Sequence, residues 1–184
     1  MQYRVIVLLV DGFEEAEAVV PIDIMRRAGM EVSLLAVGDS KLVKGSHGIT
    51  TVADGLLSEA NTPMADLLLL PGGPGTKSLE QSAPVRELVI RFAKADRWIA
   101  AICAAPMIPG ELGLLQGHQA TCYPGYELHL KGAKLMAKEV VVSGKMITAC
   151  GAGVAFQFGF EIVSQLKGRD AAYEVAKKMM AHLS

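Results

Sequence analysis

Short runs of aliphatic and β-branched residues alternate along the chain with longer stretches in which apolar residues recur every three or four positions. Unbroken apolar runs are typical of buried strands, and the longer period is typical of amphipathic helices. The predicted strands are residues 3–10, 31–38, 66–71, 98–102 and 119–123, with hairpins at 41–53 and 138–150. The predicted helices are residues 15–29, 85–95, 104–115 (whole or in part), 154–168 and 169–183.

This alternation predicts an α/β fold with a mostly parallel, doubly wound sheet and small antiparallel hairpin additions. No repeat, low-complexity tract or linker interrupts the pattern, so we expect one domain over residues 1–184. Ligands of such folds bind outside the carboxyl ends of the strands. The chemistry is therefore expected at the strand ends VDGFEE, LPGGPG, AICAAP and TCYPGY.

Composition narrows the class of protein. Hydrophobic residues make up 51% of the chain, and the net charge of −1 argues against a nucleic-acid partner or an anionic membrane surface. The apolar runs are too short to span a bilayer, and the N-terminus reads as a first strand rather than a signal peptide. Three cysteines without CxxC spacing argue against a disulfide framework or a zinc site. We therefore expect a cytoplasmic protein with neither cofactor nor metal.

Cys103 lies in RWIAAICAAPM, where a predicted strand gives way to a helix. Such a turn can hold a nucleophile at the edge of the sheet, and the N–H groups at the start of a helix favour a thiolate. A free cysteine among alanines is also an ordinary buried residue, so position alone leaves both interpretations open. For Cys122 and Cys150, packing is the favoured explanation.

The segment DGFEEAEAVVPIDIM places three glutamates at the start of the first predicted helix. Glu14 and Glu15 are explained by the helix dipole, which attracts acids to a helix N-terminus. Glu17 instead shares a helical stripe with apolar residues such as Ile24, so its carboxyl is expected to face the sheet. Burial would raise the pKa of that carboxyl, and a protonated Glu17 could donate to a thiolate or transfer a proton.

The loop LPGGPG offers backbone N–H groups that no side chain covers, and such loops can hold an oxyanion or a phosphate. It lacks the Lys–Ser/Thr pair of a Walker loop and the spacing of a dinucleotide fingerprint. A tight turn that needs glycine explains the same residues slightly better when the loop is taken alone. We interpret the four histidines as solvated surface residues: His47, His118, His129 and His182.

Together these motifs resemble the ThiJ/PfpI superfamily, in the branch of the Parkinson-disease-associated protein deglycase and its bacterial relatives. The resemblance is carried by GFEEAEAVVPIDIMRRAG, DLLLLPGGPG, IAAICAAP and ACGAGVAFQFGFEIV, in the same order over nearly the whole chain. It implies a flavodoxin-like three-layer α/β/α sandwich and a homodimer, with the first helix and its Arg26 and Arg27 as the expected contact surface. Implied activities are glyoxalase III-type conversion of methylglyoxal to lactate without glutathione, and deglycase action on glyoxal adducts.

The resemblance also implies the site residues. Cys103 becomes the nucleophile, Glu17 its protonated partner and acid/base, and the backbone N–H groups of Gly73 and Ala104 the oxyanion-binding pair. The residue after the nucleophile is histidine in the protease branch, and alanine at this position disfavours a peptidase.

Three positions depart from the family pattern. Tyr123 stands where the branch often has histidine, His47 where some members have arginine, and Ala152 where proline is usual. A tyrosine can donate a hydrogen bond but is a poor base near neutral pH, so more of the proton transfer would fall to Glu17.

Three hypotheses for function follow. The first is an enzyme for small aldehydes, in which the Cys103 thiolate adds to methylglyoxal or glyoxal and Glu17 moves a proton between adjacent carbons. The second is an oxidative-stress sensor or redox-regulated chaperone, in which Cys103 is oxidised to sulfinate and Glu17 stabilises it. The third is a ligand-binding or chaperone domain with an idle cysteine. The sequence leaves the physiological substrate open, because a pocket of small residues offers few specificity contacts.

Overall fold

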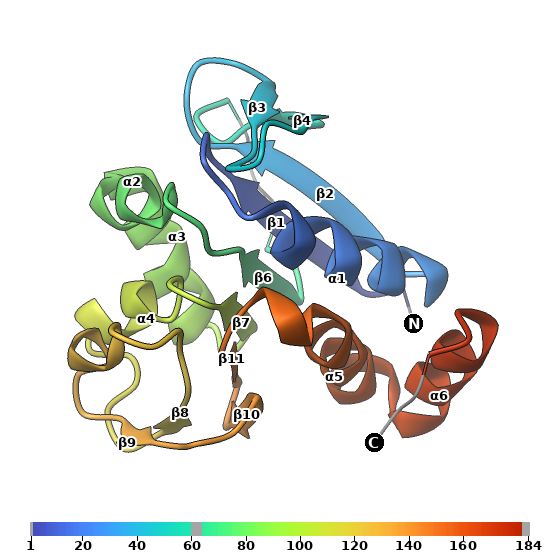
Figure 1. Cartoon of the computed structure of the whole chain (residues 1–184). Coiled ribbons are helices and arrows are strands. Elements are labelled where there is room, and N and C mark those ends of the chain that lie inside the picture. The colour runs from blue at the N-terminus through green and yellow to red at the C-terminus, as the bar shows by residue number, and fades with distance from the viewer. Residues whose placement is uncertain (1, 60–63, 182–184) are drawn as a thin grey trace.

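A computed structural model describes residues 2–59 and 64–181. Its centre is a seven-stranded sheet in the order β10-β11-β7-β6-β1-β2-β5, in which β10 and β11 pair antiparallel and the other neighbours pair parallel (Figure 1). The strands of this sheet are β1 (Arg4–Leu9), β2 (Glu31–Ala36), β5 (Gly55–Leu56), β6 (Leu67–Leu70), β7 (Trp98–Ile102), β10 (Val140–Ser143) and β11 (Met146–Ala149). Two smaller pairs are the antiparallel hairpin β3 (Leu42–Lys44) and β4 (Thr50–Val52), and the parallel pair β8 (Gln119–Ala120) and β9 (Lys134–Leu135).

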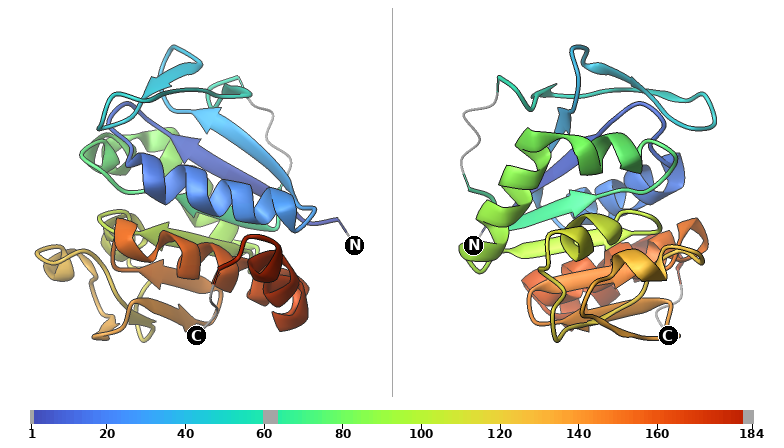
Figure 2. Two further views of the ribbon diagram at one scale, coloured as in Figure 1. Left: turned by 45° about the vertical axis from the view of Figure 1, so that its right-hand side comes forward. Right: turned by 90° about the vertical axis from the view of Figure 1, so that its left-hand side faces the viewer.

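Helices cover both faces of the sheet, as the two views of Figure 2 show. One face carries α1 (Glu15–Arg27) and α5 (Ala155–Lys167), with α6 (Arg169–Lys178) packed beside α5. The other carries α2 (Thr76–Gln81), α3 (Ala83–Lys94) and α4 (Met107–Glu111). Short 3₁₀ turns, η1 and η2, span Glu127–His129 and Ala152–Val154. The predicted three-layer α/β/α sandwich is therefore confirmed.

The all-leucine strand β6 divides the apolar core into two layers. Leu67 and Leu69 pack with the α1 and α5 side, and Leu68 and Leu70 pack with the α3 and α4 side. All four are fully buried, because successive strand residues point to opposite faces and both faces are covered. The carboxyl end of this buried strand leads directly into the glycine loop.

A glycine on α5 sets how closely α1 approaches it. A β-carbon at Gly159 would lie 2.7 Å from Cδ1 of Ile24 and 3.1 Å from Cα of Pro21. Without that side chain the two helices pack together, and α1 continues without a break through Pro21. This contact fixes the first helix, and with it Glu17, over the sheet.

Several predicted boundaries were wrong for identifiable reasons. The helix predicted over 104–115 shrinks to the five residues of α4, within a segment rich in proline and glycine. The strand predicted over 119–123 ends at Ala120, and the N–H of Tyr123 instead donates to the carbonyl oxygen of Cys103. The last helix ends at Lys178 rather than 183, and residues 182–183 of that prediction lie outside the described residues. No helix among the described residues is both long and apolar enough to cross a membrane.

Candidate active site

Cys103 occupies a strained turn at the carboxyl end of β7. Its φ angle is 65°, a left-handed conformation that costs a non-glycine residue on the order of 1–3 kcal/mol. Two hydrogen bonds hold the turn: the Cys103 N–H donates to the carbonyl oxygen of Ala149 (2.9 Å), and the Cys103 carbonyl accepts from the Tyr123 N–H (2.8 Å). A strained residue fixed from both sides matches the sharp nucleophile turn expected from the sequence.

Gly72 lies between the carboxyl group of Glu17 and the side chain of Cys103. A β-carbon at this position would be 2.5 Å from Oε2 of Glu17 and 2.7 Å from Cβ of Cys103. Its N–H donates to Oε2 of Glu17 (2.9 Å), and its carbonyl accepts from the N–H of Glu14 (2.9 Å). The glycine loop therefore brings an acid from α1 and a thiol from β7 to the same point.

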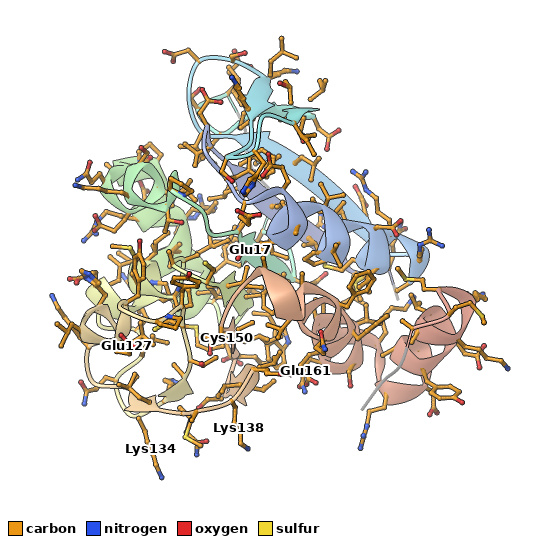
Figure 3. The ribbon with its side chains drawn as sticks, viewed as in Figure 1. Glu17, Glu127, Lys134, Lys138, Cys150 and Glu161 are labelled. Carbon is orange, nitrogen blue, oxygen red and sulfur yellow. The ribbon has the colours of Figure 1, made fainter. Side chains whose placement is uncertain are left out.

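Glu17 is buried on the side of α1 that faces the end of β6, as predicted (Figure 3). Its Oε1 atom is fully buried and finds no hydrogen-bond partner among the described residues. Burial raises the pKa of Glu17 to about 7, although hydrogen bonds from Cys103 and from the Gly72 N–H oppose the shift. A pKa raised towards neutral lets this carboxyl both bind and release a proton near neutral pH, as a proton-transfer group requires.

The thiol of Cys103 differs from the sequence-based expectation. Burial, together with the charge of Glu17, raises its pKa to about 12, while the N–H groups of Ala104 and Gly73 act in the opposite direction. The thiolate was expected from a helix N-terminus, but α4 begins only at Met107 and is short. One negative charge on the pair avoids repulsion between two, so ionisation of the thiol and of the Glu17 carboxyl oppose each other.

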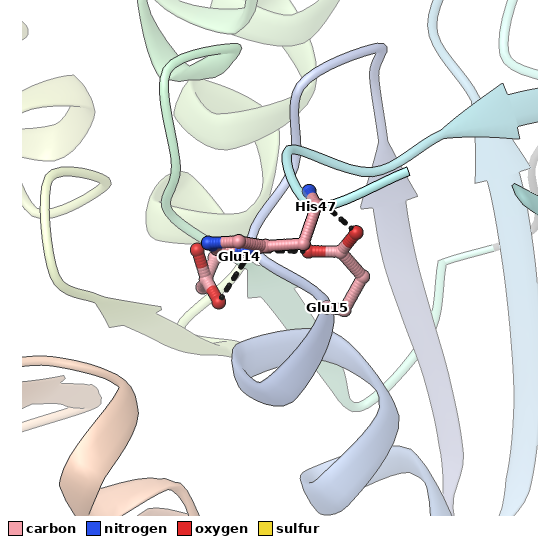
Figure 4. Close-up of side chains that lie close together, drawn as sticks. All are labelled: Glu14, Glu15 and His47. Atoms are coloured by element: carbon pink, nitrogen blue, oxygen red, sulfur yellow. Dashed lines mark hydrogen bonds and ion pairs between the residues drawn. The ribbon is translucent and has the colours of Figure 1, made fainter. Parts of the chain in front are cut away.

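Glu15 has a role that the sequence reasoning missed (Figure 4). Its carboxylate accepts from the N–H groups of His47 (2.8 Å) and Ile49 (3.3 Å), and contacts the His47 imidazole (3.0 Å). Burial opposes its ionisation, but hydrogen bonds from its own N–H, from the His47 ring and from those two N–H groups outweigh burial and lower the pKa to about 2. The feature of the sequence that is tied to this role is Gly45. Any β-carbon at this position would overlap the Glu15 carboxylate, so the loop needs a glycine here.

Glu14, Glu15 and His47 also bring ligand atoms within 4.8 Å of one another, as a metal site would require. The Glu15 oxygens are already occupied by protein donors, and the Ser46 hydroxyl contacts both glutamates (3.0 and 3.2 Å). We therefore interpret the group as a clamp that fixes the loop between β3 and β4 onto the start of α1.

The chain is similar to known proteins both in sequence and in fold. Residues 3–165 match the sequence model of the DJ-1/PfpI family. The chain belongs to the DJ-1/PfpI family. It is 39% identical over 176 residues to Protein DJ-1 homolog B of Arabidopsis thaliana, and this match covers 94% of the chain. It is 32% identical over 178 residues to the glutathione-independent glyoxalase DJR-1.2 of Caenorhabditis elegans, and this match covers 95% of the chain.

The share of each relative's length that the chain covers differs among these proteins. The chain spans 40% and 46% of the Arabidopsis DJ-1 homologs B and A, but 94% of the nematode glyoxalase. The solved structure of oxidised DJ-1 from Toxoplasma gondii superimposes with a TM-score of 0.94 at 31% identity, covering 98% of this chain and 100% of that one.

The tyrosine and the histidines singled out in the sequence lie in different surroundings within this DJ-1/PfpI fold. Tyr123 lies beside the site, half-exposed, with its ring 3.5 Å from where a β-carbon of Gly151 would be. His47 is exposed as predicted, at the clamp. His118 and His129 are half-buried rather than freely solvated, because their Nδ1 atoms contact the carbonyl oxygen of Ser143 (3.0 Å) and Oε1 of Glu111 (2.8 Å). His182 lies outside the described residues.

The four predicted site residues meet at one strand edge. The Glu17 carboxyl and the N–H groups of Gly73 and Ala104 all act on the Cys103 thiol. This is the arrangement that a thiol nucleophile needs: a group that takes its proton, and donors for a developing negative charge. The catalytic roles themselves stay predictions.

Proposed function

We propose that this DJ-1/PfpI protein is a cysteine-dependent enzyme that converts methylglyoxal to lactate, or glyoxal to glycolate, without glutathione. The observation that carries the proposal is the buried Glu17, with a pKa near 7, in contact with the strained Cys103. The name of the nematode relative, a glutathione-independent glyoxalase, supports the same chemistry. Glyoxal adducts of amines and thiols are a second substrate class for the same nucleophile.

The reaction begins with the transfer of the Cys103 proton to Glu17. The thiolate adds to the aldehyde carbon, and the oxygen of that carbon gains the negative charge. The N–H groups of Gly73 and Ala104, which act to lower the pKa of the Cys103 thiol, are suited to stabilise this oxyanion. Protonation by Glu17 gives a neutral hemithioacetal and leaves Glu17 as a carboxylate.

Glu17 then acts on the carbon skeleton. Its carboxylate removes the proton from the former aldehyde carbon to give an enediolate, the hydroxyl proton of that carbon moves to the neighbouring oxygen, and Glu17 returns its proton to the adjacent carbon to give a thioester of lactate. Water hydrolyses the thioester, which releases lactate and restores the Cys103 thiol. A carboxyl with a pKa near the working pH can both accept and return the proton.

The decisive measurement is lactate formation from methylglyoxal in the absence of glutathione. Cys103→Ala should abolish it, whereas Cys122→Ala should retain it, because Cys122 is buried in the core on the opposite side of the sheet. Full activity in Cys103→Ala would exclude this mechanism.

A second candidate function is oxidation sensing, by the stress-sensor or redox-regulated-chaperone route. It is favoured by Oε1 of Glu17, which is buried without a partner among the described residues and is next to the thiol. A protonated Glu17 would donate to a sulfinate oxygen and stabilise the oxidised cysteine. Intact-mass analysis after mild peroxide treatment tests it: two oxygens gained at Cys103 with no aldehyde turnover would favour sensing over catalysis.

A further inference from the structure

Cys103 and Cys150 are neighbours across two parallel strands. In the pairing of β7 with β11, Ile102 lies opposite Ala149. The N–H of Cys103 donates to the carbonyl oxygen of Ala149 (2.9 Å), which continues this ladder by one residue beyond the end of β7. In a parallel ladder, a residue that donates to the carbonyl of one residue lies opposite the next one. The strand pairing ends at Ile102 and Ala149, and Cys103 and Cys150 are the residues that directly follow this pair.

The spacing of these two positions suits a disulfide. Neighbouring strands lie about 4.7–4.9 Å apart, within the Cα separation of about 4.4–6.8 Å that disulfides require. Both side chains pack at the edge of the same core layer, on the α1 and α5 side, and both are partly exposed. Cys122 is buried, and its side chain packs in the other layer of the core.

We propose that Cys150 is the resolving cysteine of Cys103, so that hydroperoxides convert the pair into a reversible intramolecular disulfide. The inference rests on the reactivity of Cys103 that the proposed function assumes. Cys103 attacks one peroxide oxygen, the O–O bond breaks, and the proton held by Glu17 leaves with the second oxygen as water or an alcohol. The sulfur of Cys150 then bonds to the Cys103 sulfenic sulfur, and the Cys150 proton leaves with the sulfenic hydroxyl as water.

The bond would change the site in a defined way. The β-carbon of Cys103 lies near Gly72, on the β6 side, whereas Cys150 follows β11 on the opposite side of β7. Bond formation therefore draws the sulfur away from the glycine loop and the Glu17 carboxyl. The disulfide would stop aldehyde turnover, prevent further oxidation to sulfinate, and be reversed by a reducing thiol.

The test uses the whole chain and hydrogen peroxide, followed by alkylation of free thiols and non-reducing peptide mapping. The wild type should lose two hydrogens in intact mass and yield one linked peptide containing Cys103 and Cys150. Cys150→Ser should give no linked peptide and should accumulate Cys103 sulfinate at lower peroxide. Cys122→Ser is the matched control and should behave as the wild type.

A second measurement needs no variant of the site. Diamide, which oxidises neighbouring thiols to disulfides, should remove lactate formation from the wild type, and dithiothreitol should restore it. If sulfinate forms equally in the wild type and Cys150→Ser, with no linked peptide after peroxide or diamide, the resolving role is excluded. Failure of the proposed function is a different result, namely no lactate from the fully reduced wild type. A linked peptide would still support the inference in that case.

Discussion

Glu15 and Glu17 lie two residues apart in the first turn of α1, and both are more than nine-tenths buried, yet their acidities move in opposite directions. The pKa of Glu15 falls to about 2 and that of Glu17 rises to about 7. Glu15 is surrounded by N–H donors from the loop at residues 46–49, whereas Glu17 accepts one backbone N–H, from Gly72. Burial therefore does not decide the charge of a carboxyl by itself; the number of donors that accompany burial does.

The contrast assigns the two acids to different tasks. Glu15 is held as a permanent carboxylate that fixes a loop, and Glu17 is left with an oxygen that has no partner among the described residues. The incomplete hydrogen bonding of Glu17 costs stability, and it leaves a proton available beside Cys103.

The largest effect is expected on catalysis. Glu17→Gln should lower kcat/KM for methylglyoxal by about 10²- to 10⁴-fold, because an amide cannot take up or return the proton. Asp23→Asn is the matched control, since Asp23 is a half-exposed acid on the same helix that pairs with Arg27. It should leave lactate formation unchanged. Near-wild-type turnover by Glu17→Gln would remove Glu17 from the proposed mechanism.

Glu15→Gln should instead lower the free energy of unfolding, by about 2–3 kcal/mol at pH 7, because the hydrogen bonds it weakens are made to a charged group. The pKa of Glu15 in the folded protein, about 2, is below its ordinary value of 4.5. The stabilisation is therefore complete above pH 4.5 and is lost as the pH falls towards 2. Urea unfolding at pH 7 and pH 3 checks this: equal stabilities of variant and wild type at pH 7 would contradict the clamp.

For Glu17 the dependence of stability on pH has the opposite sign. Its pKa in the folded protein, about 7, is above its ordinary value of 4.5, so the cost of ionising it is absent below pH 4.5 and complete above pH 7. Glu17→Gln removes this cost and should raise stability at pH 8 by about 3 kcal/mol, while the gain disappears towards pH 4.5. Thermal unfolding across this range is the measurement, and a gain that does not depend on pH would argue against a buried ionisable acid.

The smallest effect concerns His47, which is exposed on the clamped loop. The hydrogen bond that its imidazole donates to Glu15, reinforced by the charges of Glu14 and Glu15, raises the pKa of the His47 ring. Glu15→Gln should return that pKa towards its ordinary value, which an NMR titration of the ring protons reports. Glu127→Gln, at a remote exposed position, should not change the titration. An unaltered His47 in Glu15→Gln would mean that the clamp contact is absent in solution.

The overall fold could be predicted from the local pattern of apolar residues, but some of its short strands and the length of one helix could not. The runs at 66–71 and 98–102 predict strands because burial on both faces requires unbroken apolar sequence. The two-residue strands β5 and β9 carry no such pattern, since they exist through their partners rather than their own residues. The length of α4 was overestimated because the helix begins only after Pro106 and ends before Gly113, whose φ angle of 72° is left-handed.

Within the site, residues recognised by local sequence features could be predicted, whereas roles that depend on contacts with distant parts of the chain could not. Cys103 and Glu17 were found because a strand end and a helical stripe are local features. The role of Glu15 was missed because its donors lie 32 to 34 residues away. The shift in the pKa of Cys103 was predicted in the wrong direction, since burial of the thiol, and then the charge of a carboxyl from another element of the fold, oppose its ionisation.

Gly72 makes this site sensitive to mutation at a residue that itself carries no reactive group. It has no side chain, yet both the acid and the thiol occupy the space that a side chain would fill. Every amino-acid replacement of a glycine adds at least one carbon, so any inherited missense change at this codon would displace both groups at once. Among descendants of this gene, the residue at position 72 is therefore a better marker of a retained active site than either reactive residue alone, since both can persist in sequence after their contact has been lost.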